Sequence, residues 1–132
     1  MGYSNLLAGI RPKTLEGQIV SDADMCTLGG ATAICRILRY GEKIGRPIFD
    51  KSIFPRLYDI DAEEYKKRNN TDINHFFEKL LRLRGLLFTK TARDIATPGH
   101  EFMIQFLRNY FAENNVPEWT EFLDKYTAEL LR

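Results

Sequence analysis

The spacing of the apolar residues is the feature that most constrains the fold of this chain. They recur every three or four positions almost throughout the sequence, and strict alternation appears over no useful length. A recurrence of three and four places side chains on one face of an α-helix, whereas a half-buried strand requires a period of two. The pattern therefore predicts an all-α fold.

The first predicted helix begins at Thr14, a good capping residue, and continues to about Gly41 or Gly45. Two adjoining apolar stripes run along it, one through Ile19, Ala23, Cys26, Gly30, Ala33 and Ile37, the other through Val20, Thr27, Ala31, Ile34 and Leu38. Such a wide apolar arc predicts a mostly buried helix. The run Gly29-Gly30-Ala31 costs helix propensity, up to ~1 kcal/mol for each glycine. We therefore expect another backbone to approach closely there.

Later helices are predicted from capping and first-turn residues. These are Thr71 for a helix that continues to Leu87, Thr89 or Thr91 for the next, and Pro117 for the last. Pro98-Gly99 should kink or break the middle one, and Asn114-Asn115 should end it.

The organisation is that of a single helical domain over residues 1–132, a bundle of about five helices. Residues 46–70 contain Pro47, Pro55 and a charged run, which fit either an irregular surface loop or a short helix.

Charge and composition exclude several classes of partner. Lysine and arginine total 19 against 18 acidic residues, a net charge of +1, so the chain lacks the electrostatic footprint of a nucleic-acid or anionic-membrane binder. No stretch approaches the roughly 20 apolar residues that span a bilayer. Cys26 and Cys35 fit reduced thiols in the core of a cytoplasmic protein.

The sequence Asp22-Ala23-Asp24 is anomalous because it interrupts the most apolar helix. Asp24 falls on the apolar stripe, and a carboxylate that faces a core is costly unless it is paired or binds a metal. The alternatives are that the helix turns both aspartates to solvent, or that Asp24 pairs with an arginine such as Arg36 or Arg82.

The residues His75, Lys79 and Arg82 are four and three positions apart, so they would form one polar face beside an apolar stripe. Such a face could hold an anion such as phosphate. A solvated basic face explains the same spacing. His100 follows the Pro-Gly pair, and no function is assigned to it.

Three ordered segments resemble the HD-domain metal-dependent phosphohydrolases. One branch of that superfamily carries a late helix that reads roughly E-G-x-I-V-x-D-A-D, then G-A and I-A-R. The matching segments here are Leu15–Asp24 with Gly29-Gly30-Ala31 and Ile34-Cys35-Arg36, then His75–Leu83, then Thr89–Phe106. The resemblance extends from about Thr14 to Phe111, most of the chain.

The resemblance implies an α-helical fold that holds one or two divalent metals, Mn²⁺, Mg²⁺, Ni²⁺ or similar, whose bound water attacks a phosphate ester or anhydride. Asp24 matches the last aspartate ligand of the family. His75 and Lys79 match positions that face the substrate phosphate. The implied activity is hydrolysis of a phosphate ester or nucleotide.

The other metal ligands of the family have no counterpart here. They are a histidine and an adjacent His-Asp pair on earlier helices, whereas only 13 residues precede Thr14, none of them histidine, and no His-Asp dipeptide occurs. Met25-Cys26-Thr27 stands where the branch usually has R-L-D. The chain thus resembles the C-terminal half of such a hydrolase, either a piece that starts at an internal methionine or a natural remnant. Weak or absent metal binding and no activity alone are expected.

The loss of covering helices would expose the apolar arc of the first helix, and exposed patches of this kind favour association. We therefore expect a homo-oligomer in which the first helix packs against its copy near Gly29-Gly30-Ala31. The alternative function is a non-catalytic helical interaction module that self-associates.

Overall fold

The computed structural model describes residues 3–55 and 70–130, and all regular structure within these ranges is helical. The elements are α1 (Tyr3–Leu7), α2 (Leu15–Met25), α3 (Ala31–Ile44), α5 (Asp72–Glu78), the 3₁₀ turns η1 (Leu80–Arg82) and η2 (Arg84–Leu86), α6 (Lys90–Glu113) and α7 (Pro117–Leu130). The expected all-α fold is confirmed. Of the expected irregular segment, residues 56–69 lie outside the described part.

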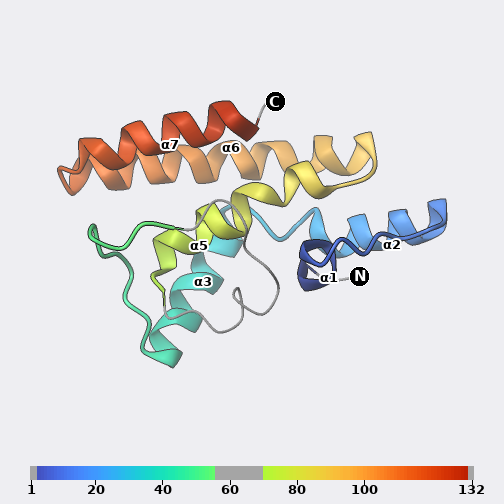
Figure 1. Cartoon of the computed structure of the whole chain (residues 1–132), viewed down its shortest axis with the longest axis horizontal. Coiled ribbons are helices and arrows are strands. Elements are labelled where there is room, and N and C mark those ends of the chain that lie inside the picture. Colours follow the sequence, from blue (N-terminus) through green and yellow to red (C-terminus); the bar gives the residue numbers. More distant parts are fainter. Residues whose placement is uncertain (1–2, 56–69, 131–132) are drawn as a thin grey trace.

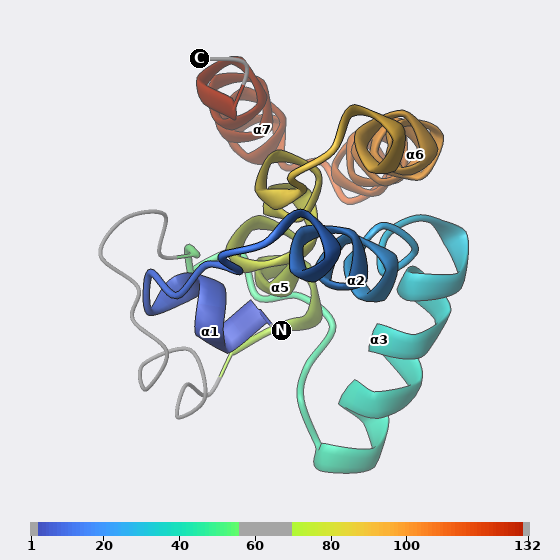
Figure 2. The ribbon, with the colours of Figure 1, turned by 90° about the vertical axis from the view of Figure 1, so that its right-hand side faces the viewer.

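The helices form two groups that meet along α5. The two long helices α6 and α7 lie side by side along one edge of the molecule (Figure 1). Seen from the end, α5 and the short turns lie beneath this pair, with α2 and α3 towards one side and α1 towards the other (Figure 2). The segments α5–η1–η2 therefore occupy the centre.

Aromatic side chains join α5 to the α6–α7 pair. Phe77 is fully buried and meets Phe122 of α7 edge-on, with ring centroids 5.1 Å apart. Phe111 of α6 packs on Trp119 of α7 at 5.6 Å. Burying large rings of this kind dominates the energetics of a small core.

The predicted helix starts are confirmed by their caps. Thr14, Thr71 and Thr89 each accept a hydrogen bond through the side-chain oxygen from the backbone N–H three residues later, at 3.0, 3.1 and 3.2 Å. The predicted end of α6 at the asparagine pair and the first-turn position of Pro117 are also confirmed.

The first predicted helix is wrong as a single helix, because the chain breaks between α2 and α3. Gly30 has φ +90° and ψ −165°, a backbone conformation that residues other than glycine rarely adopt. A Cβ on Gly30 would come within 3.2 Å of the Cα of Gly99 in α6. The expected close backbone approach therefore exists, but its partner is α6 of the same chain. Gly30 is therefore buried within the chain, and the predicted self-association of the first helix stays a prediction that would have to use other residues of that helix.

Pro98 does not break the next helix, contrary to expectation. Helix α6 continues through it from Lys90 to Glu113. Pro98 lies on the exposed face, where water can satisfy the helix carbonyl that loses its N–H partner. The predicted helix from Thr71, by contrast, ends early at Glu78, because Lys79 leaves the helical region (φ −137°, ψ −64°) and 3₁₀ turns follow.

Burial differs sharply between α2 and α3. Ala33, Ile34 and Ile37 of α3 are buried. On α2, however, Leu15 is 62% exposed and Val20 is 59% exposed. The expectation of a mostly buried first helix is therefore wrong for α2, and the expected exposure of an apolar arc is confirmed there.

The two cysteines are both free, as expected, but Cys35 is exposed and Cys26 half-buried, so the prediction of a core thiol is wrong for Cys35. Across the described ranges, no helix combines the length and the apolar character that crossing a bilayer requires.

Substitution of Gly30 tests the break between α2 and α3. Gly30→Ala should lower the free energy of unfolding by about 1–3 kcal/mol, because it forces a side chain into a glycine-only conformation. Urea unfolding measures the change. Gly85→Ala is the matched control, since no atom lies within 4 Å of the added Cβ. Equal free energies of unfolding for the two variants would contradict the positive φ angle at Gly30.

Candidate functional site

The carboxylate of Asp22 fixes the C-terminal part of α2. It is buried, at 2% exposure. One oxygen accepts from the backbone N–H of Phe88 at 2.8 Å, and the other accepts from the N–H and the hydroxyl of Thr89, both at 2.7 Å. Hydrogen bonds to a charged acceptor are stronger than neutral ones. Asp22 therefore ties α2 to the start of α6.

Asp24 points away from this anchor. Two positions along a helix correspond to a rotation of about 200°, so burial of Asp22 turns Asp24 outward. Its side chain is exposed. The predicted inward orientation of Asp24 is therefore wrong, and the inward carboxylate is Asp22. Spacing alone could not distinguish the two, because the apolar arc of this helix is too wide to fix its rotation.

His75 lies in the middle of α5 and is half-buried. Burial is the main cause that lowers its pKa to about 3, and the charges of Lys79 and Arg46 lower it further. The imidazole is therefore neutral at pH 7. In this form it can accept or donate a hydrogen bond, but it brings no positive charge to an anion.

Lys79 stands at the end of α5, where the helix breaks. Its ammonium lies 5.6 Å from the ring centroid of Tyr3 in α1, within the range of a cation–π contact. Burial lowers the pKa of Lys79. Tyr3 is held over it, because the phenol donates a 2.5 Å hydrogen bond to the carbonyl of Glu78. His75 and Lys79 thus remain neighbours, as the sequence predicted.

Arg82, the third residue of the predicted polar face, interacts with the side chain of Tyr3, the same ring that lies over Lys79. Its Nε donates to the carbonyl of Phe77 and to the hydroxyl of Tyr126 in α7, both at 3.2 Å. Tyr126 donates to the same carbonyl at 2.5 Å. The early end of α5 leaves that carbonyl without a helical partner, and these two side chains satisfy it. These hydrogen bonds give Arg82 a structural role that the spacing could not reveal.

The residues described here do not fit a complete metal site. Within residues 3–55 and 70–130, no three histidine, cysteine, aspartate or glutamate side chains lie close enough together to hold an ion. Hard divalent cations take six or more oxygen ligands, several of them from protein or water. Asp24 can supply one of these, and it cannot hold the ion alone.

A groove that the sequence did not predict lies between α2 and the start of α6. Its volume is about 430 Å³. We call it the α2–α6 groove, and it is lined by Ile19, Asp22, Ala23, Cys26, Thr89, Thr91, Ala92 and Ile95. Ile19 and Ile95 on its walls are 52% and 57% exposed. An apolar surface of this kind is typical of a site where other protein surface packs.

No protein-family model matches the chain. Among curated proteins, it is similar to the uncharacterized protein YpgQ of Bacillus subtilis, with 34% identity over 106 residues, which cover 80% of this chain and 42% of YpgQ.

Several solved structures also match the chain. A protein from Lactobacillus plantarum matches at 37% identity and TM-score 0.78, over 87% of this chain and 56% of its own. An HD-superfamily hydrolase from Bacillus thuringiensis matches at 35% identity and TM-score 0.63, over 77% and 47%. B. subtilis YpgQ in complex with ADP matches at 31% and 0.57, over 76% and 44%. The chain has an HD-like fold and spans about half the length of these relatives.

The two aspartates of α2 should differ in their effect on stability. Asp22→Ala leaves half-buried N–H groups at residues 88 and 89 unpaired, so it should cost about 2–4 kcal/mol of unfolding free energy. Asp24→Ala removes an exposed side chain and should cost less than about 1 kcal/mol. Urea unfolding of both variants measures the difference. A larger loss for Asp24→Ala would show that the assigned rotation of α2 is incorrect.

His75 should make the fold acid-sensitive. Its folded pKa of about 3 lies below its ordinary value of 6.5. Between these values the unfolded chain binds the proton more readily, so stability falls as the pH falls. The effect is on the order of 2 kcal/mol between about pH 7 and pH 5. Urea unfolding at both pH values measures it, and His75→Gln should flatten the dependence. An unchanged dependence in that variant would contradict a half-buried, neutral imidazole at His75.

Proposed function

We propose that this chain is part of a metal-dependent phosphohydrolase of the HD superfamily that hydrolyses a phosphate ester or a nucleotide. The observation that carries the proposal is the match to the HD-superfamily hydrolase from B. thuringiensis, at 35% identity over 77% of this chain. The three ordered motifs lie within the resemblance and add to it. In the proposed roles, Asp24 supplies one metal ligand, and His75 and Lys79 face the substrate phosphate.

The chemistry of the pair on α5 supports the phosphate assignment. Lys79 brings a positive charge that suits phosphate oxygens, and the neutral imidazole of His75 brings a hydrogen bond. One relative, YpgQ, has been crystallised with ADP. We therefore favour a nucleotide, with its phosphate anhydride, over a simple phosphate ester as the substrate class.

The metal would be held only with donors from elsewhere. The chain has two histidines, His75 and His100, and no His-Asp pair. The α2–α6 groove lies on the helix that carries Asp24, and its apolar walls suit further helices. We propose that helices carrying the histidine and His-Asp ligands pack there, and that the chain without them is inactive. No chemical step is assigned to the metal in this chain.

A second candidate is a self-associating interaction module without catalysis. The exposed residues Leu15, Ile19 and Val20 favour it, because the same apolar face of α2 would suit a second copy of the chain. The two candidates differ in what covers α2, so they are separable by experiment.

A fusion tests the proposed activity. The 132-residue chain alone should bind no stoichiometric Mn²⁺ and release no phosphate from ADP, ATP or a panel of phosphate esters. Joined to the part of YpgQ that it does not cover, it should bind Mn²⁺ and hydrolyse a nucleotide. Metal analysis and phosphate release are the measurements, with Mg²⁺ and Ni²⁺ tested in parallel. In the fusion, Asp24→Asn should lower kcat by more than the ~10–100-fold typical of an outer-shell metal partner.

The matched control is Asp94→Asn, which removes another exposed carboxylate, one paired with Lys90 at 2.6 Å. It should leave turnover unchanged, whereas Lys79→Met should raise KM. A folded but inactive fusion, together with an oligomeric chain in sedimentation velocity, would support the interaction module instead. Full activity of the Asp24→Asn fusion would contradict the assigned ligand.

A further inference from the structure

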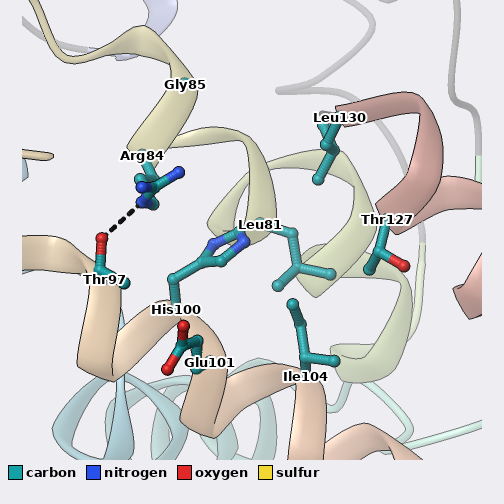
Figure 3. A pocket seen from close by; sticks show the side chains of 9 residues that line it. All are labelled: Leu81, Arg84, Gly85, Thr97, His100, Glu101, Ile104, Thr127 and Leu130. Atoms are coloured by element: carbon teal, nitrogen blue, oxygen red, sulfur yellow. Dashed lines mark hydrogen bonds between the residues drawn. The ribbon is translucent and has the colours of Figure 1, made fainter. Parts of the chain in front are cut away.

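A second cavity lies on the other side of the short turns, between η2, the middle of α6 and the C-terminal end of α7 (Figure 3). Its volume is about 280 Å³, close to the lower end of small-molecule pockets at roughly 300–1,000 Å³. None of Asp24, His75 and Lys79 lines it. The cavity is therefore separate from the residues of the proposed hydrolase site.

Arg84 supplies the positive charge of this cavity. It is half-buried, and its Nε donates a 2.7 Å hydrogen bond to the hydroxyl of Thr97. Thr97 in turn donates to the carbonyl of Arg93 at 2.7 Å, so the guanidinium is held in place. Within residues 3–55 and 70–130, Arg84 makes no other hydrogen bond or ion pair. Its two terminal amino groups are thus preorganised donors without an acceptor among the residues that the structure describes.

His100 stands beside it. Its ring extends from α6 into the space between Arg84 and Leu81 (Figure 3). The Nδ1 atom is buried and has no hydrogen-bond partner among the residues that the structure places. Burial and the charge of Arg84 lower the pKa of His100, against the opposite effect of Glu101, so the ring is neutral at pH 7. Burying an unpaired nitrogen acceptor costs less free energy than burying an unpaired N–H. We therefore place the proton of the neutral ring on Nε2.

The remaining wall is apolar. It is formed by Leu81 of η1, Ile104 of α6 and Leu130 of α7. Leu81 is buried, and Leu130 at the mouth is 40% exposed. Glu101 is exposed at the rim, where its charge repels each negative charge of a ligand, so one carboxylate is opposed less than two. The cavity therefore combines one fixed cation, one neutral donor and a hydrocarbon wall, with one carboxylate at its rim.

We propose that this cavity binds a small organic monocarboxylate. Its carboxylate pairs with the terminal amino groups of Arg84 and accepts a hydrogen bond from the Nε2–H of His100. Its apolar body lies against Leu81, Ile104 and Leu130. Because Leu81 and Arg84 belong to the turns that follow α5, such a ligand joins these turns to α6 and α7. The proposal does not depend on the hydrolase function, since the two sites share no residue.

Benzoate is a suitable probe, because it has one carboxylate and a compact apolar body. The full 132-residue chain is titrated with benzoate, and the side-chain signals of its two histidines are followed by NMR. We expect a saturable shift of the His100 signals, with those of His75 unmoved. Benzamide has the same body without the charge and should bind at least about tenfold more weakly. No saturable shift of His100 at millimolar benzoate, or equal binding of benzamide, would overturn the proposal.

A pair of variants tests the assigned cation. Arg84→Met should weaken benzoate binding at least about tenfold. Arg93→Met is the matched control, because Arg93 is also half-buried and bonded to a backbone carbonyl, that of Leu87 at 3.0 Å, yet does not line the cavity. It should bind benzoate as the unchanged chain does. Equal binding by folded Arg84→Met would overturn the proposal. If that variant fails to fold, the comparison of benzoate with benzamide on the unchanged chain still decides.

Discussion

The three hydrogen bonds accepted by Asp22 are the constraint on which the arrangement of this molecule depends. They join α2 to the residues at which α6 begins, segments 66 and 67 positions apart in the sequence. A short helix that exposes Leu15, Ile19 and Val20 has little apolar burial of its own to hold it. The buried carboxylate supplies the attachment, because it satisfies backbone N–H groups at residues 88 and 89 that would otherwise be unpaired.

The same attachment divides the acidic motif between two roles. Asp22 is buried, so helix geometry places Asp24 at the surface. An exposed carboxylate on an apolar helix fits a molecule whose α2 face meets further protein. In the proposed hydrolase that surface receives the remaining metal ligands, and in the interaction module it receives a second copy. In both proposals, other protein covers the α2–α6 groove.

The contact between Gly30 and Gly99 places the start of α3 against α6. Two helices rarely approach so closely unless both lack a Cβ, and each glycine here would bring an added Cβ to 3.2 Å from the other backbone. Gly99 follows Pro98, so a pair that weakens α6 locally also allows α3 to begin against it. The break after α2 therefore lies at the point where the chain packs closely against α6.

Much of the fold was determined by the sequence alone. The period of the apolar residues dictated an all-α chain. Local chemistry dictated the starts at Thr14 and Thr71 and limited the next start to Thr89 or Thr91, because a threonine hydroxyl caps the backbone three residues ahead wherever the helix packs. The adjacency of His75 and Lys79 also followed from spacing, since one helical turn separates them.

Only the tertiary structure decided which way the polar residues point. Asp22 rather than Asp24 is buried because donors at Phe88 and Thr89 lie against that face of α2, and Arg82 turns to α7 because α5 ends early and leaves a carbonyl to satisfy. The cavity at Arg84 and His100 likewise exists only where η2, α6 and α7 meet. A period fixes which residues share a face. What packs against that face depends on contacts between segments distant in sequence, and no local pattern encodes these contacts.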